Sequence, residues 1–378
     1  MSRCTAVICE LNPLHKGHAH VFNHAVQYGA PVLAVMSGNF TQRSECAVFD
    51  KYKRAELAVR AGADIVVELP FPWCSSGGEF FALGGVAIGT SLGSDRFIFG
   101  SESGDTEFVK KAAACMKSEE FKNRLTCEST SDSGTAAAHD RAMKHFGFSL
   151  GANDKLASQY INAAEKLGAD AEFTAVRRIS DREVYRSATE LREMIYDGNI
   201  AEAKRFMPHC RDDISISDVC RDKLSELEYI FFRLFYHKGD GERILDGGGG
   251  VADRLAWAAG ESASYADFFE TAATKKYTDS RLRRAALFTM LGVSREDAVT
   301  SPEFTFLLGA SKRGREYIAA LGDNIGVSLL TKPSAVHRLT DTEKRQYKLS
   351  VSADEVYALC MTRGVKSGEF LRRKPYIE

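Results

Sequence analysis

Short apolar runs alternate with amphipathic stretches along the first half of the chain. Runs rich in Val, Ile and Phe predict five β-strands, over residues 4–9, 31–36, 63–69, 95–100 and 171–176. Helical spacing of apolar positions predicts helices over residues 18–28, 50–62, 78–92, most of 105–167, and 187–196. Strands that alternate with helices in this way are typical of a parallel sheet covered on both faces. We therefore expect an α/β fold over residues 1–197.

Helical periodicity dominates after residue 197. The stretch 222–237 places five apolar side chains on one face of a predicted helix, Leu224, Leu227, Phe231, Leu234 and Phe235. A glycine run at 246–250 predicts a turn, and further helices are expected up to about residue 322. The pattern therefore predicts a second, mainly helical domain over residues 198–378.

Composition agrees with two folded domains. The chain has 378 residues, which exceeds the size of one ordinary hydrophobic core. Its 44% hydrophobic and 27% charged residues are typical of globular proteins. We find no apolar run approaching the roughly 18 residues that span a bilayer, and no secretory signal. A membrane protein is therefore not expected.

Cysteine usage and charge exclude two further classes. The nine cysteines are odd in number and include no CxxC pair, which argues against a disulfide framework or a zinc knuckle. A reducing, cytoplasmic location fits best. A net charge of −1 excludes a uniformly basic nucleic-acid-binding surface, so a nucleic acid would have to meet local basic patches.

Candidate chemistry begins in the segment ELNPLHKGHAHVF, residues 10–22, directly after the first predicted strand. Ligands bind at this edge of a parallel sheet, where helix N-termini offer free N–H groups to phosphate. Gly17 would allow close approach to the backbone, and His15 and His18 would add hydrogen-bond donors. The HxGH pattern predicts a nucleotide pocket, although this segment alone leaves an ordinary turn with packed histidines equally open.

A metal site is a weaker interpretation of the same segment. His15, His18, His20 and His24 lie within ten residues, and the last two have helical i,i+4 spacing. No acidic residue or cysteine completes a ligand set at useful spacing. We therefore expect no metal held by the protein here.

A second candidate motif is SATELR, which places Ser187, Thr189 and Arg192 in the first turn of a helix that follows a strand. Hydroxyls at this position are ordinary N-caps. Combined with HxGH, however, they would give two helix N-termini that hold a triphosphate from both sides. Arg192 would then neutralise the charge on the departing pyrophosphate.

HxGH followed by SxTxxR resembles the nucleotidyltransferase superfamily with the HIGH motif. The resemblance covers nearly the whole chain. The blocks MSGNFTQRSE, DKYKRAELAVRAGADIVVELP, FGSES, GANDKLASQY, SATELR, TKKYTDSRLRRAAL and LLGASKRGRE are similar, in this order, to the motifs of the tRNA(Met) cytidine acetate ligase family. This resemblance implies a Rossmann-like nucleotidyltransferase parallel sheet with a C-terminal mainly helical domain. The domain that contains the sheet would bind nucleotide and carry out catalysis, and the helical domain would bind tRNA.

This resemblance also implies an activity. Members of the family activate acetate with ATP as acetyladenylate, release pyrophosphate, and transfer the acetyl group to N4 of the wobble cytidine of elongator tRNA(Met). The product is N4-acetylcytidine. The implied cofactors are ATP and ATP-bound Mg²⁺, and the implied partners are acetate and elongator tRNA(Met). No protein partner is evident from the sequence.

Site residues follow from the matched positions and from the two motifs. The predicted catalytic residues are His15 and His18. The predicted ATP-binding residues are Ile8, Cys9, Glu10, Leu11, Asn12, Pro13, Leu14, His15, Lys16, Gly17, His18, Ala19, His20, Val21, Gly100, Asn153, Arg178, Ser187, Thr189 and Arg192. Gly100, Asn153 and Arg178 rest on the resemblance alone.

Two departures from the family pattern bear on the pocket. Leu11 and Leu14 stand where Tyr and Phe are usual, which would alter packing beneath the turn but keep its polar atoms. Ser44, Glu45 and Cys46 stand where Gly-Glu-Pro is typical. Replacing Gly by Ser would reshape that loop if its backbone needs a positive φ.

Two basic clusters are candidates for contact with RNA. The first, in TKKYTDSRLRR, gathers Lys275, Lys276, Arg281, Arg283 and Arg284 around Tyr277, which could stack on a base. The predicted tRNA-binding residues among them are Lys275, Lys276, Arg281 and Arg284. Charge alone favours a solvated helix face, whereas the resemblance favours tRNA binding. The second cluster comprises Arg363, Lys366, Arg372, Arg373 and Lys374, and its role is left open.

Two other functions fit parts of the sequence. A small-molecule adenylyl- or cytidylyltransferase would need only the HxGH and SxTxxR motifs, but it leaves the helical second half without a role. A non-catalytic nucleotide- or RNA-binding module is the other alternative. Acetate-dependent release of pyrophosphate would distinguish an acetate ligase from both.

Overall fold

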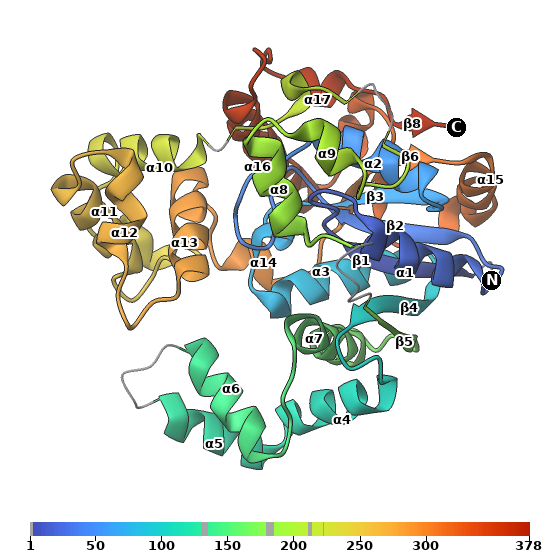
Figure 1. Cartoon of the computed structure of the whole chain (residues 1–378), viewed down its shortest axis with the longest axis horizontal. Helices are drawn as coiled ribbons and strands as arrows, with labels where there is room; N and C mark the ends of the chain where they lie inside the picture. The colour runs from blue at the N-terminus through green and yellow to red at the C-terminus, as the bar shows by residue number, and fades with distance from the viewer. Residues whose placement is uncertain (1–2, 130–134, 179–184, 211–213, 222) are drawn as a thin grey trace.

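The computed structural model describes residues 3–129, 135–178, 185–210, 214–221 and 223–378. Its centre is a twisted sheet in which five parallel strands have the order β5-β4-β1-β2-β3 (Figure 1). These strands are β1 (Cys4–Cys9), β2 (Val32–Ser37), β3 (Ile65–Leu69), β4 (Ser94–Ser101) and β5 (Glu172–Arg177). All five predicted strands are confirmed, and so is the α/β fold class.

The sheet is buried on both faces. Successive residues of β1 alternate between two hydrophobic clusters, with Ala6 and Ile8 in one and Val7 and Cys9 in the other. Helices α3 (Gly78–Ser91) and α7 (Ala152–Lys166) pack in the first cluster, whereas α1 (Lys16–Val26), α2 (Lys51–Arg60) and α8 (Ala188–Tyr196) pack in the second. This two-sided burial explains why the strands read as continuous apolar runs.

The second half of the chain contributes strands that the sequence analysis missed. Residues 304–310 were expected to be helical, but Phe304–Ala310 forms β6, which pairs antiparallel with β3. Two short strands, β7 (Ser328–Leu330) and β8 (Tyr376–Ile377), pair parallel with β6. The sheet therefore draws on both sides of residue 197, and the proposed division of the chain at that point stays a prediction.

Two groups of helices extend from this core. The helices α10 (Leu224–Leu234), α11 (Val251–Glu261), α12 (Phe268–Ala272) and α13 (Asp279–Leu291) form a helical lobe at the left of Figure 1. They enclose a separate hydrophobic cluster that includes Phe232, Leu255, Phe268 and Leu282. A smaller projection contains α4 (Thr106–Lys117), α5 (Glu119–Ser129) and α6 (Thr135–His145). The predicted helical second region is thus confirmed.

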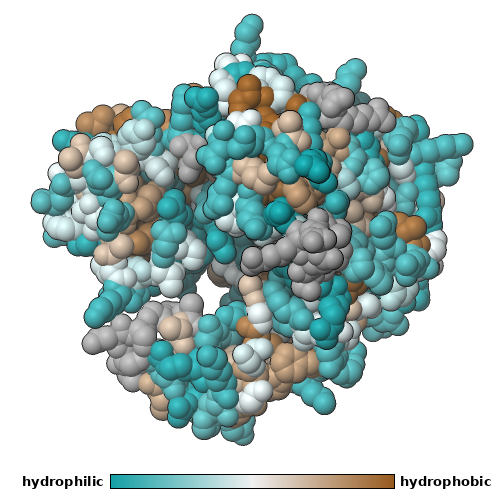
Figure 2. All heavy atoms as spheres, in the orientation of Figure 1, coloured by the Kyte–Doolittle hydropathy of each residue, from teal (hydrophilic) through white to brown (hydrophobic). Residues whose placement is uncertain are grey.

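Helix α10 buries a different face from the one predicted. Leu224 and Phe232 are buried, but Leu234 and Phe235 are exposed. Figure 2 shows hydrophobic side chains on the surface over this helix. The buried positions Leu224, Glu228 and Phe232 repeat at i,i+4. The helix therefore buries a face beside the more apolar face that was predicted to be buried. Asp222, where the predicted helix began, lies outside the described residues.

The remaining elements connect the lobe to the core and close the fold. They are α9 (Ile200–Lys204), α14 (Glu296–Val299), α15 (Lys312–Leu321), α16 (Asp341–Cys360) and α17 (Glu369–Arg372). Single 3₁₀ turns are η1 (Trp73–Ser75), η2 (Ile216–Asp218), η3 (Asp240–Arg243), η4 (Tyr265–Asp267), η5 (Gly322–Asn324) and η6 (Pro333–Arg338). Within the described residues, no helix is both long and apolar enough to span a membrane.

Candidate active site

A cavity of about 320 Å³ opens at the C-terminal ends of β1, β4 and β5. Its walls also include the first turn of α1, the loop after β2 and the starts of α7 and α8. The predicted segment 8–21 contributes Ile8, Cys9, Glu10, Leu11, His15, Gly17, His18, His20 and Val21 to the lining. Asn12, Pro13, Leu14, Lys16 and Ala19 lie outside that lining. The cavity is therefore at the place that the HxGH motif predicts.

His15 and His18 form a reciprocal cap at the N-terminus of α1. The His18 backbone N–H donates to Nδ1 of His15, and the His15 backbone N–H donates to Nδ1 of His18, each over 3.3 Å. The two rings stack with their centroids 3.8 Å apart. Because each Nδ1 accepts a hydrogen bond, each neutral ring carries its proton on Nε2.

The surroundings keep both rings neutral. Burial lowers the pKa of His15 to about 4, with a further contribution from the positive charge of Arg178. Burial also lowers the pKa of His18, aided by His15 and Arg178. Two Nε2–H groups beside the positive end of α1 are suited to donate to phosphate oxygens. Among the described residues there is no group of three His, Cys, Asp or Glu side chains that could hold a metal ion.

At position 17 the backbone passes close to the rings of His15 and Tyr185, which leaves no space for a side chain. A Cβ atom at this position would lie 2.9 Å from Cε1 of His15 and 3.1 Å from the ring of Tyr185. Both distances are shorter than ordinary contacts, so a side chain here would displace His15 or Tyr185. The glycine of HxGH therefore keeps the backbone open at the cavity.

Glu10, at the end of β1, connects the motif to the loop after β2. Its Oε1 accepts a hydrogen bond of 2.6 Å from the backbone N–H of Gln42. Burial raises the pKa of Glu10, although that hydrogen bond and Arg54 act in the opposite direction. The carbonyl oxygen of Glu10 accepts from the buried guanidinium of Arg54, which also donates to carbonyls of Ser37 and Phe49. Arg54 thus holds the ends of β1 and β2 together.

The residues inferred from resemblance on β4, α7 and β5 lie together on one wall. Gly100, Asn153 and Arg178 all line the cavity. Glu102 joins them, because its carboxylate accepts from Nδ2 of Asn153 at 2.6 Å and lies 4.0 Å from the Arg178 guanidinium. Arg178 also donates to the hydroxyl of Tyr185. Their contact with nucleotide stays a prediction, but the fold brings them together from three distant segments.

The SATELR residues lie next to the cavity, and one of them holds the HxGH turn through a hydrogen bond. Ser187 is the N-cap of α8 and accepts from the backbone N–H of Glu190. Arg192 donates to the carbonyl oxygen of Asn12 at 2.9 Å and to the hydroxyl of Thr189. Ala188 lines the cavity, whereas Ser187, Thr189 and Arg192 do not. Arg192 therefore anchors the HxGH turn, and direct contact between these residues and ATP stays a prediction.

Several cavity residues were not singled out from the sequence. They are Gln42, Arg43, Phe81, Leu156, Tyr160, Arg177 and Tyr185. The first two belong to MSGNFTQRSE, which was recognised as a motif block without a role for any side chain. Phe81 lies in the largely buried helix α3 and Leu156 in α7, and in both helices the sequence alone cannot distinguish an apolar residue at a cavity from one in the core.

The loop after β2 does adopt the conformation that a glycine would favour. Ser44 has φ +57° and is buried, and its backbone N–H donates to the carbonyl oxygen of Thr41 at 2.8 Å. Its hydroxyl donates to the carbonyl oxygen of Ser75, which compensates part of the backbone strain. Leu11 also has a positive φ, +52°, and Leu11 and Leu14 are fully buried in the core cluster beneath the turn.

The predicted RNA patch is only partly free. Lys275 and Lys276 are exposed, and the ammonium of Lys276 lies 5.1 Å from the Tyr277 ring centroid. Arg281 lies 5.3 Å from the same ring and borders a second cavity, which residues of α3 and α16 also line. Arg284 instead pairs with Asp246, at 2.6 Å, in the glycine-rich turn. The tRNA role of these four residues stays a prediction.

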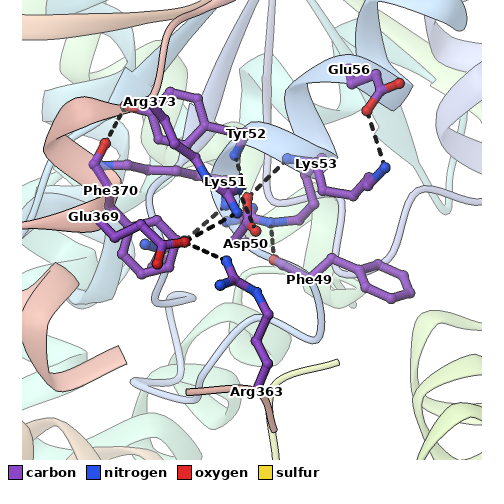
Figure 3. Close-up of polar contacts among 12 residues, drawn as sticks. Phe49, Asp50, Lys51, Tyr52, Lys53, Glu56, Arg363, Glu369, Phe370 and Arg373 are labelled. Atoms are coloured by element: carbon purple, nitrogen blue, oxygen red, sulfur yellow. Dashed lines mark hydrogen bonds and ion pairs between the residues drawn. The ribbon is translucent and has the colours of Figure 1, made fainter. Parts of the chain in front are cut away.

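Two arginines of the C-terminal basic cluster, Arg363 and Arg373, form ion pairs (Figure 3). Arg373 contacts the carboxylate of Asp50, the N-cap of α2, at 2.7 Å. Arg363 contacts Glu369 at 2.6 Å. The contact of Arg373 fixes the end of the chain against α2, and that of Arg363 lies within the C-terminal segment, so both arginines have carboxylate partners in the protein itself.

Comparison with known proteins agrees with this geometry. The family model described as HIGH Nucleotidyl Transferase matches residues 2–370. A tRNA(Met) cytidine acetate ligase of Fervidobacterium nodosum is 30% identical over 383 residues, covering 93% of this chain and 90% of that protein. The corresponding ligase of Thermotoga maritima is 29% identical over 371 residues, covering 88% and 87%.

The fold matches a solved structure over its whole length. The crystal structure of Thermotoga maritima TmcAL bound with alpha-thio ATP has a TM-score of 0.90 and 27% sequence identity, covering 100% of this chain and 99% of that one. The similarity thus extends through both the sheet and the helical lobe. This chain belongs to the tRNA(Met) cytidine acetate ligase family of HIGH nucleotidyl transferases.

Proposed function

We propose that this protein uses ATP to join acetate to N4 of the wobble cytidine of elongator tRNA(Met), in the cytoplasm. The observation that carries the proposal is the pair of neutral histidines, His15 and His18, which cap α1 at the floor of the cavity. The free cysteine thiols are consistent with a reducing compartment. The family relationship indicates the acceptor, tRNA(Met), and the acid, acetate. The cavity indicates where ATP would bind and which groups would contact its phosphates.

In the first step, an acetate oxygen attacks the α-phosphorus of ATP. A bond forms between that oxygen and phosphorus, the bond from phosphorus to the bridging oxygen breaks, and pyrophosphate leaves with the electron pair. The Nε2–H groups of His15 and His18 and the free N–H groups of α1 would stabilise negative charge on the phosphate oxygens. Little proton transfer is needed, which suits histidines held neutral.

In the second step, the cytidine N4 attacks the acetyl carbonyl carbon. AMP leaves with the electron pair of the broken acyl–oxygen bond, and N4 loses one proton. The HxGH turn, whose preceding carbonyl oxygens are bound by Arg54 and Arg192, would keep the adenylate in place for this attack.

In this proposal Mg²⁺ would enter the site bound to ATP. No cluster of three His, Cys, Asp or Glu side chains that could hold a metal occurs in the described ranges. Oxygens of the triphosphate and water are the ligands that Mg²⁺ ordinarily takes in nucleotide sites. When bound, the ion would neutralise charge on the triphosphate.

One experiment tests donor, cofactor and product together. The protein is incubated with tRNA, ATP, Mg²⁺ and isotopically labelled acetate, and the nucleosides are analysed by mass spectrometry. Labelled N4-acetylcytidine is expected with unmodified elongator tRNA(Met) and absent with a transcript whose wobble cytidine is replaced by uridine. Its absence from both would refute the proposal, and acetate-independent pyrophosphate release with a small metabolite would favour a small-molecule nucleotidyltransferase.

A further inference from the structure

We propose that Arg43 binds the carboxylate of the acid substrate, and that Leu156 and Tyr160 limit the length of its carbon chain. This inference rests on the proposed function and assigns a subsite within the same cavity. The need for it is electrostatic. Acetate and the triphosphate are both anions, so the acid requires a cation of its own to approach the α-phosphate.

Arg43 is the cavity arginine best placed to supply that cation. Arg177 donates to the carbonyl oxygen of Ser103 at 2.7 Å, and Arg178 donates to Tyr185. The exposed guanidinium of Arg43 lines the cavity, and it has no hydrogen-bond acceptor or ionic partner among the residues that the structure describes. A planar guanidinium can bind a carboxylate through two parallel hydrogen bonds.

The topology separates Arg43 from the expected nucleotide wall. Gly100 lies near the C-terminal end of β4 and Arg178 follows β5, and both strands lie on one side of β1 in the sheet. Arg43 follows β2, on the other side of β1. His15 and His18, at the end of β1, lie between these two walls. With the phosphates at the two histidines and the nucleoside toward β4 and β5, the β2 side is left for the acid.

The loop that carries Arg43 is held in place on both sides. The backbone N–H of Gln42 donates to Glu10, and the backbone N–H of Thr41 donates to the carbonyl oxygen of Glu45 at 3.0 Å. The Ser44 hydroxyl fixes the loop to Ser75. A guanidinium without its own partner, on a loop with this many anchors, is a preorganised anion site.

An apolar wall lies next to the same loop. A methyl group built on Gly78, at the start of α3, would be 3.8 Å from Nε2 of Gln42 and 3.8 Å from Cδ1 of Leu156. Leu156 and the largely buried Tyr160, one turn later on α7, both line the cavity. Because Arg43, Leu156 and Tyr160 line the same cavity, the proposal places the short alkyl group of a carboxylate held at Arg43 against Leu156 and Tyr160.

Acetate-dependent exchange between ATP and labelled pyrophosphate tests the carboxylate site without tRNA. For Arg43→Ala we expect the KM for acetate to rise about tenfold or more, with recovery of part of that loss in Arg43→Lys. The dissociation constant for ATP, measured by calorimetry without acetate, is expected to stay within about twofold of wild type. Arg205→Ala, a surface arginine paired only with Glu202, is the matched control.

The outcomes separate the two proposals. An unchanged KM for acetate in Arg43→Ala overturns the assignment, and so does a parallel loss of ATP affinity, which would make Arg43 a phosphate ligand. If wild-type protein supports exchange with no carboxylate, the proposed function fails and the Arg43 assignment fails with it. Because no described residue relies on the Arg43 guanidinium, the variant is expected to unfold at the wild-type temperature, which a thermal scan checks.

The apolar wall has its own readout. Leu156→Ala is expected to raise kcat/KM for butyrate relative to acetate by about tenfold, because the lost side chain makes room for two methylene groups. A ratio that does not change would show that the chain length is limited elsewhere.

Discussion

His15 and His18 each accept a hydrogen bond at Nδ1 from the backbone N–H of the other. The same two hydrogen bonds therefore cap the helix and orient both rings. Each ring is left with one polar group, Nε2–H, for a ligand in the cavity. The HxGH motif thus provides neutral donors, not the imidazolium cations that its histidines suggest.

This relationship predicts different effects for two substitutions of His15. His15→Asn keeps an acceptor at the N-cap but removes the Nε2–H group, because asparagine is a good capping residue. We expect its free energy of unfolding to stay within about 1 kcal/mol of wild type, while acetate-dependent pyrophosphate release falls about 100-fold or more. His15→Ala should lose both stability and activity. If His15→Asn retains wild-type turnover, the ring is a cap and not a phosphate ligand.

The low pKa of His15 predicts that stability falls in mild acid. The unfolded chain takes up a proton on this histidine near pH 6.5, whereas burial holds the folded pKa at about 4. Between these values the unfolded state binds more protons, so stability decreases as the pH is lowered. The contribution amounts to about 3 kcal/mol when the pH has fallen to the folded pKa. Urea unfolding at pH 7 and pH 5 should show a smaller loss for His15→Asn than for wild type, and an equal loss would contradict the assigned cause.

Ser44 predicts a contrast between glycine and alanine. Both substitutions remove the hydrogen bond to Ser75, but only alanine keeps a Cβ atom at φ +57°. Ser44→Gly should therefore be more stable than Ser44→Ala by about 1 kcal/mol, since the left-handed conformation costs roughly that much for a residue with a side chain. Paired denaturant curves measure the difference. Equal stabilities would mean that the loop relaxes to negative φ.

A buried lysine connects the sheet to α16. Nζ of Lys51 lies 2.7 Å from Glu68, on β3, and 2.7 Å from Asp354, on α16. Burial opposes its charge, but the two carboxylates outweigh burial and raise the pKa of Lys51. Lys51→Met would leave two buried carboxylates without a cation.

We expect Lys51→Met to destabilise the protein by about 3–5 kcal/mol, the usual cost of breaking a buried ion pair. The triple variant with Glu68→Gln and Asp354→Asn should recover most of that loss, because no uncompensated charge remains. Urea unfolding at neutral pH measures both. If the triple variant is no more stable than Lys51→Met, the loss arises from packing and not from charge.

The sequence predicts the place of the cavity and the five parallel strands, but not the strands that the second half of the chain adds to the sheet. HxGH locates the cavity because its function depends on adjacent residues and on one helix N-terminus. Strand β6 escapes detection because the apolar run FTFLLGA has no period that distinguishes a buried strand from a buried helix. Its place beside β3 depends on a partner more than 200 residues away, as the Thr305 hydroxyl bond to the carbonyl oxygen of Glu68 shows.

The partners of individual side chains could not be predicted for a similar reason. Arg281 and Arg284 have the i,i+3 spacing of one helix face, but Arg284 also pairs with Asp246. Arg192 donates to the carbonyl oxygen of Asn12, a partner that the SATELR motif does not indicate, and its contact with phosphate stays a prediction. In both cases the deciding partner is distant in the chain, so local spacing could not reveal it.

The contrast between exposed lysines and a paired arginine predicts how the basic patch of the helical lobe contacts tRNA. Lys275 and Lys276 are exposed and unobstructed, and Arg284 is held by Asp246. A lysine that meets a phosphate releases condensed counterions on binding, so its removal lowers the salt dependence of affinity by about 0.7–0.9 in the logarithmic slope. Lys275→Ala combined with Lys276→Ala should therefore weaken binding of tRNA and flatten that slope. Arg284→Ala should loosen the glycine-rich turn but leave the slope unchanged. The control, Lys344→Ala, removes a surface lysine on α16 and should also leave the slope unchanged. Filter binding of tRNA at 50–200 mM salt measures all three, and a slope that is the same for the double lysine variant and for wild type would remove these lysines from the tRNA interface.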